Sequence, residues 1–386
     1  MGATQAAVGQ VTETAERLSS GPQTLIPVYR PDLSGNERRY VMDCLETGWI
    51  SSLGVYVERF ERAVAERTGA AHAIATCNGT VALHLALHGL GIGAGDEVIV
   101  PAFTYIASAN AVSYTGARPV FADSDPRDWL LDPASVEARV TPRTRAIMAV
   151  HLYGAACDMA ALRAIADRHG LALVEDAAEA LGTTIAGRHV GAFGDAAAFS
   201  FFGNKTVTTG EGGMVVCGDA AVAGRVRQAR GQGQSLTRRY WHEVMGFNYR
   251  MTNVAAAIGC AQMERLDAIL ARKRALAARY RALLAGLPVT FQQARPGVES
   301  AEWLVSVLLP EGACRDAVMA GMAAHGVETR PVFYCAHAMP VQRQDVSLPA
   351  AEAIAARGLS LPSFPGLTDG EQDRVVDALG EALAAA

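Results

Sequence analysis

The sequence lacks an excess of basic charge, because 34 Lys and Arg residues stand against 39 Asp and Glu residues, for a formal net charge of -5. Proteins that bind nucleic acids through phosphate contacts usually carry a basic excess or a basic stripe, so we do not expect this function. Long apolar runs are missing too. The longest charge-free region, residues 70–95, is interrupted by three His, one Asn and five Gly, and therefore predicts no membrane span. Residues 1–24 have neither a basic start nor an apolar stretch, so they predict no signal peptide.

Cysteine pairs at the spacing of a disulfide framework or a metal site are also missing. The seven Cys residues are scattered, odd in number and never form a C-x-x-C motif, which favours reduced thiols in the cytoplasm. His84 and His88 lie four residues apart in a helical pattern, the spacing of a metal-binding pair. No acidic general base or third ligand accompanies them, so we interpret them as ordinary helix residues and expect no metal site.

Length and composition indicate a globular protein with more than one domain. Half of the 386 residues are apolar, 19% are charged and the mean hydropathy is +0.14, which is typical of soluble proteins. A single core stops growing at about 250–300 residues, so we expect a larger and a smaller domain. We predict a mobile N-terminal arm (1–24), a large α/β domain (25–252), a connecting helix (253–285) and a small C-terminal α+β domain (286–386).

Helical patterns alternate with short apolar runs in the large domain, which favours a mainly parallel sheet. A helix is predicted over residues 57–69, with Gly69 as its left-handed cap. Ligands bind such sheets beyond the carboxyl ends of the strands, and the polar motifs of this chain follow those ends. Strands are predicted over residues 97–100, 118–121, 146–151, 171–175, 197–202, 214–217 and, in the small domain, 303–309. Small-domain helices are predicted over residues 315–325 and 369–383.

The first polar motif is S-F-F-G-N-K-T-V-T-T-G-E-G-G, residues 200–213, in which Lys205 follows a strand and precedes a glycine-rich turn. Desolvation beside packed aromatic residues disfavours an ammonium group, and imine chemistry requires the neutral amine. Taken alone, however, a solvated loop lysine is the more common interpretation.

The second motif, L-A-L-V-E-D-A-A-E-A-L-G, residues 171–182, carries Glu175 and Asp176 to the end of a predicted strand. A carboxylate there can keep a heteroaromatic nitrogen protonated, as a pyridoxal ring needs in order to act as an electron sink. Asp176 also suits the N-cap of a short helix that we predict after it, and both roles are possible at once.

Two weaker motifs also follow strands or open helices. In C-N-G-T-V-A-L-H-L-A-L-H-G-L-G, residues 77–91, a Gly-Thr turn opens a helix whose free N–H groups can bind an anion, and Gly79 permits close approach of a phosphate. In P-A-F-T-Y-I-A-S-A-N-A-V, residues 101–112, Tyr105 lies where its ring can cover a flat cofactor. By itself, the first of these motifs is equally typical of an ordinary helix cap, and the second of aromatic packing.

Together the motifs resemble those of the DegT/StrS group of sugar-nucleotide aminotransferases, which are pyridoxal-phosphate (PLP) enzymes of fold type I, the aspartate-aminotransferase fold. The resemblance extends from residue 26 to residue 368. It implies a large, mainly parallel α/β domain that binds PLP and a small C-terminal α+β domain. The motifs that carry it are N-G-T, P-A-F-T-Y, H-L-Y-G, E-D-A-A-E-A-L-G, S-F-F-G-N-K and G-F-N-Y-R-M-T-N.

The resemblance implies two catalytic residues and two cofactor contacts. Lys205 matches the lysine that binds the aldehyde of PLP and then moves protons. Asp176 matches the partner of the pyridinium nitrogen, and Glu179 lies where the family keeps a polar residue near the cofactor. Tyr105 matches the aromatic residue that stacks on the cofactor ring.

The resemblance also implies a phosphate site and a dimer. Gly79, Thr80 and Ser200 match the residues around the cofactor phosphate. Asn248 matches an asparagine that reaches the phosphate from the neighbouring subunit, so a homodimer with shared active sites is implied. Pyridoxamine phosphate, the amine form of the cofactor, is implied between the two halves of the reaction.

Within the family, residues 230–253 are most similar to the branch that makes perosamine, whose members aminate C4 of a GDP-linked 4-keto-6-deoxyhexose. This similarity implies sugar-nucleotide contacts at Ser51, Arg250, Tyr334 and His337. Around His337 the chain reads Y-C-A-H-A-M-P-V where relatives read like Y-P-L-H-x-x-P-Y, so several residues are smaller than usual. A wider pocket, a dTDP carrier, amination at C3 or a cyclitol acceptor therefore stay open.

We predict a PLP-dependent aminotransferase that moves an amino group from L-glutamate to a nucleotide-linked keto sugar by a ping-pong mechanism. Lys205 argues against a dehydratase of the same group, in which histidine replaces this lysine. A non-catalytic PLP-binding regulator would need a DNA-binding segment, which the sequence does not indicate. A purely structural protein does not explain why six polar motifs lie where strands end.

Overall fold

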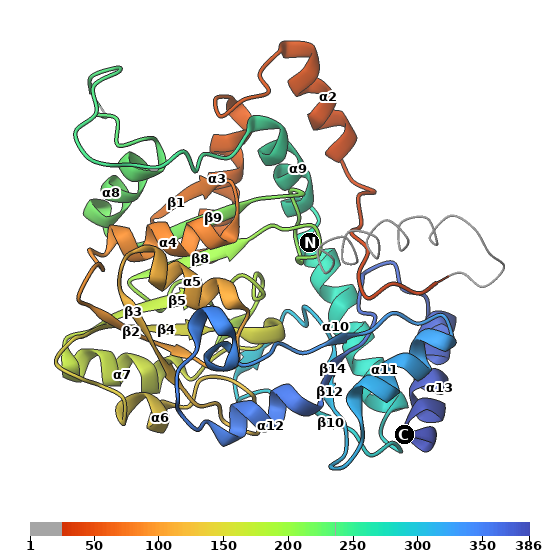
Figure 1. The fold of residues 1–386 in the computed structure, drawn as a ribbon. Coiled ribbons are helices and arrows are strands. Elements are labelled where there is room, and N and C mark those ends of the chain that lie inside the picture. The colour runs from red at the N-terminus through yellow and green to blue at the C-terminus, as the bar shows by residue number, and fades with distance from the viewer. Residues whose placement is uncertain (1–24, 236) are drawn as a thin grey trace, which may run out of the picture.

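A seven-stranded sheet forms the centre of the larger unit (Figure 1). The computed structural model describes residues 25–235 and 237–386, so the arm predicted over residues 1–24 lies outside the described residues. The strands of this sheet are β1 (His72–Thr76), β2 (Glu97–Pro101), β3 (Arg118–Ala122), β4 (Thr144–Val150), β5 (Ala172–Asp176), β8 (Ala196–Ser200) and β9 (Gly213–Cys217). Their order across the sheet is β1-β9-β8-β5-β4-β2-β3. Of these seven strands β9 alone runs antiparallel to its neighbours, so the carboxyl ends of the other six meet at one edge.

The sequence predicts six of these strands and misses β1. The missed strand reads H-A-I-A-T, and its alanines are depleted in strands generally, so it carries little β signal of its own. Tertiary pairing with β9 makes it a strand, in register from His72 opposite Cys217 to Thr76 opposite Gly213.

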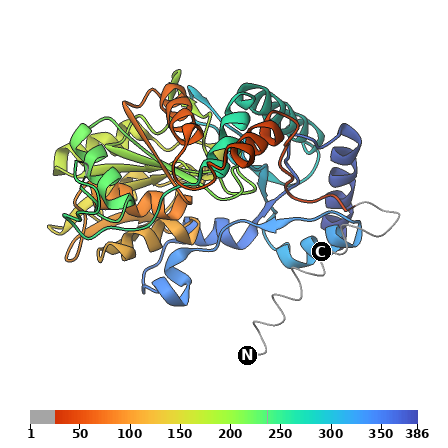
Figure 2. The same cartoon turned by 90° about the horizontal axis from the view of Figure 1, so that it is seen from above.

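Helices cover both faces of the sheet (Figures 1 and 2). Successive side chains of a strand point to opposite faces of the sheet, so β1 contributes side chains to the cores on both faces. Its Ile74 packs with α4 and α8, whereas Ala73 and Ala75 belong to the core that includes α2, α3 and α9. These helices of the larger unit are α2 (Glu37–Thr47), α3 (Val55–Thr68), α4 (Gly79–Gly89), α5 (Ile106–Tyr114), α6 (Pro133–Glu137), α7 (Met159–His169), α8 (Ala220–Arg230) and α9 (Asn253–Met263).

The predicted helix over residues 57–69 is α3, and Gly69 caps it in the left-handed region at φ 72°. The single helix predicted over residues 253–285 is instead two, α9 and α10 (Leu266–Leu283). The two residues between them turn their side chains to the N-terminal segment: Glu264 accepts a hydrogen bond from Tyr40 Oη, and Arg265 pairs with Asp32 at 2.7 Å. These long-range contacts are the physical reason for the break.

The smaller unit contains a four-stranded antiparallel sheet in the order β10-β12-β14-β13, with α10 leading into it (Figure 1). Ile26 bridges Val327 and belongs to the core of this unit. The predicted strand over residues 303–309 is shorter, at residues 306–308. The strands are β10 (Thr290–Phe291), β12 (Ser306–Leu308), β13 (Arg330–Pro331) and β14 (Gly358–Ser360), and the helices are α11 (Arg315–Ala324), α12 (Pro349–Arg357) and α13 (Asp369–Ala385). A third sheet joins β11 (Val298–Glu299) to β6 (Thr184–Ile185) and β7 (Arg188–His189), and the short 3-10 helices are η1 (Leu152–Gly154), η2 (Ala336–Ala338) and η3 (Pro340–Gln342).

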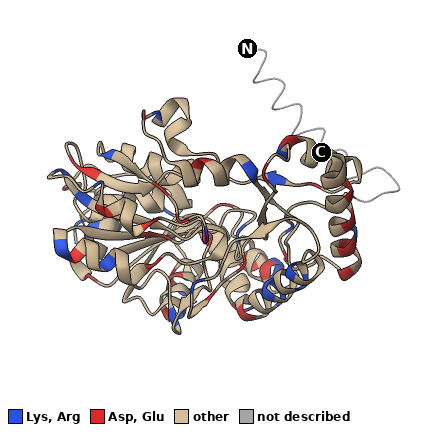
Figure 3. Cartoon of the chain, turned by 90° about the horizontal axis from the view of Figure 1, so that it is seen from below, with Lys and Arg blue, Asp and Glu red and all other residues tan. Residues whose placement is uncertain are grey.

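Acidic and basic residues are interspersed along the elements of both units (Figure 3). Many of them pair, as Arg163 does with Asp167 at 2.8 Å within α7. None of the helices in the described ranges combines the length with the apolar character that a membrane crossing requires.

Candidate active site

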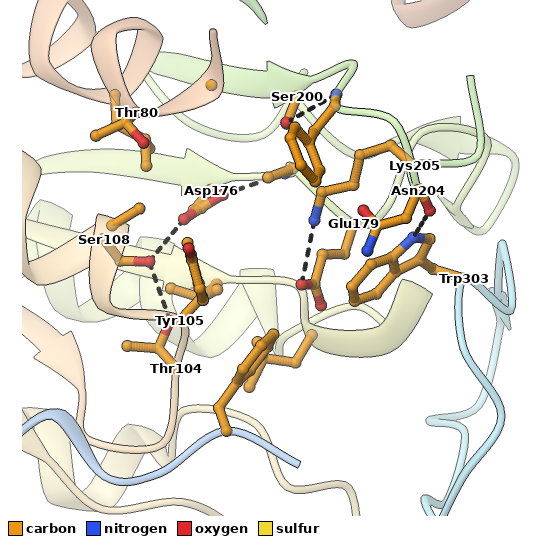
Figure 4. A pocket seen from close by; sticks show the side chains of 18 of the residues that line it. Thr80, Thr104, Tyr105, Ser108, Asp176, Glu179, Ser200, Asn204, Lys205 and Trp303 are labelled. Atoms are coloured by element: carbon orange, nitrogen blue, oxygen red, sulfur yellow. Dashed lines mark hydrogen bonds and ion pairs between the residues drawn. The ribbon is translucent and has the colours of Figure 1, made fainter. Parts of the chain in front are cut away.

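A cavity of about 730 Å³ opens at the carboxyl edge of the seven-stranded sheet, where Trp303, Arg330 and Phe333 of the smaller unit complete its lining. Seven residues that the sequence predicts as cofactor contacts line this cavity, several of them as sticks in Figure 4. They follow β1, β2, β5 and β8, so the parallel sheet brings together segments that are far apart in the chain. The seven residues are Gly79, Thr80, Tyr105, Asp176, Glu179, Ser200 and Lys205.

Asp176 is the last residue of β5, and its carboxylate is buried beside the cavity. Ser108 Oγ donates to Oδ2 over 2.7 Å, and the backbone N–H of Ala178 donates to Oδ1 over 3.1 Å. Burial raises the pKa of Asp176, while the bond from Ser108 opposes that shift. Residues 177–182 form turns rather than the helix predicted there, so the helix-cap interpretation of Asp176 is wrong.

Lys205 lies in the loop between β8 and β9, with 13% of its side chain exposed. Its Nζ is 3.3 Å from Glu179 Oε1 and 4.0 Å from the centre of the Trp303 ring (Figure 4). Its backbone carbonyl accepts a hydrogen bond from Tyr29 Oη over 2.8 Å. The alternative of a solvated loop lysine is therefore wrong, because the amine points into the cavity.

The chain has only one other lysine, since Lys205 and Lys273 are the only two among its 34 basic residues. Lys273, on α10, is 1% exposed and donates from Nζ to the carbonyl oxygens of Trp303, over 2.9 Å, and Ser363, over 2.8 Å. Burial lowers the pKa of Lys273 to about 7. Lys205 is therefore the one lysine of this chain that a ligand in the cavity can reach.

Glu179 connects the amine of Lys205 to the main chain of Tyr153. Its Oε2 accepts a hydrogen bond from the Tyr153 N–H over 2.8 Å, and its Oε1 faces Lys205 Nζ. Burial raises the pKa of Glu179, against the lowering effect of the Lys205 charge. A buried carboxylate in this position can hold a proton or a charge next to the amine.

The N-terminus of α4 forms a corner suited to an anion. Asn78 caps the helix by accepting a hydrogen bond from the Val81 N–H over 3.0 Å. A Cβ on Gly79 would lie 2.7 Å from Ser200 Cβ, so glycine lets the helix start and the end of β8 approach this closely. The free N–H groups of a helix start attract phosphate, and Thr80 and Ser200 add hydroxyl groups to the same cavity.

Four aromatic rings form one wall of the cavity. Tyr105, which is 57% exposed in the single chain, has its ring 5.5 Å from Phe333. Phe333 stacks on Tyr153 at 5.5 Å and 16°, and Tyr153 stacks on Trp303 at 6.2 Å and 13°. We call these four rings the aromatic wall; a flat ligand can lie in the cavity beside them.

The donor set in this cavity fits PLP. An aldehyde needs the amine of Lys205, a pyridine nitrogen needs a carboxylate such as Asp176, and a phosphate needs the α4 corner. Metal chemistry has no comparable set, because no group of three or more His, Cys, Asp and Glu residues in the described ranges is arranged to hold an ion.

Five predicted contacts are not brought into this cavity by the single chain. Arg250 and Asn248 are exposed and hydrogen-bonded to each other over 3.0 Å. Asn248 is predicted to act across a dimer, which one chain does not test. His337 is buried, with its Nε2 3.2 Å from Glu352 Oε1. The roles of all five stay predictions; the residues are Ser51, Asn248, Arg250, Tyr334 and His337.

Sequence analysis missed several residues that contact the predicted ones. Ser108 lies one helical turn after Tyr105 in the same motif, residues 101–112, so the sequence contained a signal that could have identified it. Tyr153 belongs to the H-L-Y-G motif, but nothing there indicates its bond to Glu179. Trp303 and Arg330 come from the smaller unit, and only long-range packing places them in the cavity.

Comparisons with known proteins show the family of this chain. A family model described as the DegT/DnrJ/EryC1/StrS aminotransferase family matches residues 31–380. The chain is 50% identical over 364 residues to the GDP-perosamine synthase of Caulobacter vibrioides, covering 93% of this chain and 98% of that protein. It is 45% identical over 360 residues to the GDP-perosamine synthase of Vibrio cholerae, covering 92% of this chain and 98% of that protein.

Among solved structures, the chain is similar to DesV of S. venezuelae. The two have a TM-score of 0.85 and 41% sequence identity, covering 90% of this chain and 94% of that one. The similarity therefore includes both the sheet that carries the cavity and the smaller unit that closes it.

Proposed function

The chain belongs to the DegT/DnrJ/EryC1/StrS aminotransferase family, and from this premise we propose that it transfers the amino group of L-glutamate to C4 of a GDP-linked 4-keto-6-deoxyhexose. It is a PLP-dependent sugar aminotransferase of fold type I. The observation that carries the proposal is the one cavity that holds Lys205, Glu179 and Asp176 beside a helix N-terminus. The sugar and its carrier are proposed from the two GDP-perosamine synthases that are 45% and 50% identical to this chain.

The cavity residues divide the binding of PLP between them. The α4 corner would hold the phosphate through the N–H groups of Gly79 and Thr80 and the hydroxyl of Ser200. Asp176 would hold the ring nitrogen, and Tyr105 would cover one face of the ring. PLP, when bound, supplies an electron sink for the carbon that loses its proton.

Lys205 is the residue that would take this proton and return it at the next carbon. Its Nζ faces the cavity, and Glu179 holds the amine from the other side at 3.3 Å. A base held in this position reacts with the bound substrate in an effectively unimolecular step, rather than after a random encounter in solution. A cationic ring nitrogen beside Asp176 would favour its ionised form and oppose the effect of its burial.

Both substrates would use this one cavity in turn, because Lys205 is the one lysine that lines it. We therefore propose a ping-pong sequence in which 2-oxoglutarate leaves before the keto sugar enters. In the proposed homodimer, Asn248 reaches the phosphate of the neighbouring site. Arg250, His337, Ser51 and Tyr334 are proposed to approach the sugar nucleotide.

The first experiment records the visible absorption spectrum of the PLP-loaded protein and then adds excess L-glutamate without any sugar. We expect the cofactor band to change to that of pyridoxamine phosphate, with one 2-oxoglutarate formed per site. A band that neither glutamate nor glutamine moves would contradict the proposed donor. A second step offers GDP- and dTDP-linked 4-keto and 3-keto sugars to the aminated protein, and conversion of only a 3-keto or dTDP-linked sugar would overturn the proposed acceptor.

Replacement of the proposed catalytic lysine tests the chemistry at its centre. Lys205→Ala removes the only lysine that lines the cavity, so turnover should fall below detection, a loss of at least about 10³-fold. Borohydride treatment of the PLP-loaded wild type should leave the pyridoxyl mass on the peptide that contains Lys205. Full activity of Lys205→Ala, or a label on Lys273 alone, would rule out this assignment.

A further inference from the structure

The amine of Lys205 lies between two groups that attract positive charge. Glu179 Oε1 is 3.3 Å from Nζ, and the centre of the Trp303 ring is 4.0 Å from it. The face of an indole ring attracts a nearby cation, most strongly where water is excluded. The sequence places this amine beside packed aromatic residues, and in the structure it contacts both a carboxylate and the face of an aromatic ring.

Hydrogen bonds at three atoms hold Trp303, one through its ring and two through its main chain. Its Nε1 donates to the carbonyl of Asn204 over 2.7 Å, and its backbone N–H donates to the carbonyl of Tyr153 over 3.0 Å. Its own carbonyl accepts the bond from Lys273 Nζ. Asn204 directly precedes Lys205, so the ring contacts both the main chain and the amine of the same loop.

The backbone around this contact adopts unfavourable conformations. Tyr153 has a φ of 58° and Glu302, which precedes Trp303, has a φ of 51°, both in the left-handed region that favours glycine. A Cβ on Gly154 would lie 2.7 Å from Glu302 N and 2.8 Å from Trp303 N. Residues in such conformations persist where the surrounding structure requires them, which is common at active sites.

We infer that Trp303 is a positioning residue for Lys205, and that its ring receives the amine whenever Lys205 is not bound to the cofactor, including after the amine has taken the proton of the amino donor. The inference rests on the proposed function, because only a lysine that leaves and rejoins the cofactor needs a second position in which its amine is bound. The proton that Nζ takes from the amino donor stays on Nζ until Lys205 passes it on within the cavity. Trp303 and Glu179 together keep that charged group inside the cavity rather than in solvent.

The test uses protein loaded with pyridoxamine phosphate, which has no aldehyde and therefore leaves Lys205 free. Limiting acetic anhydride is added at a series of pH values, and acetylation of Lys205 is measured by mass spectrometry after digestion. In Trp303→Leu, Lys205 should be acetylated about tenfold more than in the wild type where the wild type is labelled slowly, since a desolvated ring–cation contact is lost. Trp303→Phe keeps a ring and should show a smaller increase.

A matched control separates this effect from the general loss of a tryptophan. Trp129 is fully buried and packs edge-on against Tyr153 at 6.5 Å, so it touches the aromatic wall from behind and does not line the cavity. Trp129→Phe should keep the wild-type labelling profile. An equal change in Lys205 labelling in Trp129→Phe and Trp303→Leu would overturn the inference, because it would indicate a general loss of packing around the cavity.

Two further outcomes decide the remaining cases. A folded Trp303→Leu that binds the cofactor and keeps the wild-type profile would overturn the inference, and if that variant does not fold, an unmoved profile in Trp303→Phe would do so. Failure of the proposed function is read separately, as wild-type protein that glutamate does not convert. In that event the same labelling series on cofactor-free protein still decides whether Trp303 holds the amine.

Discussion

Two carboxylates three residues apart take different partners in this site. Asp176, at the end of β5, accepts hydrogen bonds from Ser108 and Ala178. Glu179, in the turn that follows, faces Lys205 and accepts from the Tyr153 N–H. Burial raises the pKa of both, and a cationic partner beside each carboxylate opposes that shift. The different partners fit the two proposed tasks, one at a ring nitrogen and one at an amine.

At the scale of single residues, Gly79→Ala should weaken PLP binding by about tenfold to a hundredfold. The added Cβ would lie 2.7 Å from Ser200 Cβ, and such overpacking costs about 1–3 kcal/mol at the proposed phosphate corner. Titration of the apoprotein with PLP, followed by absorbance, measures the effect. Gly224→Ala is the control, because a Cβ at that position in α8 meets nothing within 4 Å. If Gly79→Ala binds PLP with wild-type affinity, the phosphate of PLP does not bind at the α4 corner.

The residues that the sequence predicts best are those that directly follow strands. Asp176 and Lys205 are recognisable because the motif around each is local, and a parallel sheet brings strand ends together. Trp303 is not recognisable in this way. Its role depends on bonds to Tyr153, Asn204 and Lys273, which lie far from it in the chain. Contacts of this kind leave no periodicity or spacing in the sequence.

At the scale of elements, one side chain joins the start of α9 to the loop before α3. Asn253, the last residue of the G-F-N-Y-R-M-T-N motif, is buried and donates from Nδ2 to the Trp49 carbonyl over 2.7 Å. Its Oδ1 accepts from the Tyr56 N–H over 3.0 Å. Part of this motif is therefore structural, since Asn253 does not line the cavity.

Asn253→Ala should lower the free energy of unfolding by about 2–4 kcal/mol, because it leaves one backbone donor and one backbone acceptor without partners. Urea unfolding followed by circular dichroism measures this loss. Asn110→Ala is the control: Asn110 accepts one bond from Gln342 Nε2 over 3.0 Å, and its loss should cost about 1 kcal/mol or less. Equal losses in the two variants would contradict a linking role for Asn253.

The elements themselves were predictable to different degrees. Apolar runs identify the central strands, because a strand covered on both faces needs them. The break between α9 and α10 was not predictable, because it depends on Asp32 and Tyr40, more than 200 residues away from Arg265 and Glu264. The helical periodicity continues across that break and predicts one helix.

At the scale of the whole molecule, the predicted family and fold are confirmed. We expect the stability of this fold to depend on pH through the buried side chain of His189. His189, in β7, uses both ring nitrogens in the neutral form: Nε2 accepts from the Gly182 N–H over 2.8 Å, and Nδ1 contacts the Val190 carbonyl. Burial lowers the pKa of His189 to about 4. A proton on Nε2 would meet the Gly182 N–H, so geometry and burial both favour the neutral ring.

The free energy of unfolding should therefore fall as the pH falls from about 6.5 toward 4. The unfolded chain binds a proton at His189 near pH 6.5, whereas the folded protein resists it until about pH 4, so this contribution is complete above pH 6.5 and is lost below it. Urea unfolding at pH 7, 6, 5 and 4.5 measures the slope. His189→Gln should lower stability at pH 7 but flatten the slope, and an unchanged slope would assign the pH dependence to other groups.

Because the chain has only two lysines, digestion with a lysine-specific protease can measure how much of the protein carries the cofactor. A lysine-specific protease finds only two bonds to cut in the denatured chain, after Lys205 and after Lys273. Once reduction has fixed the proposed bond between the cofactor and Lys205, the first of these bonds should resist cleavage. The share of fragment 1–273 in the sum of fragments 1–273 and 1–205 on a gel then gives the occupied fraction, without a substrate or a spectrum.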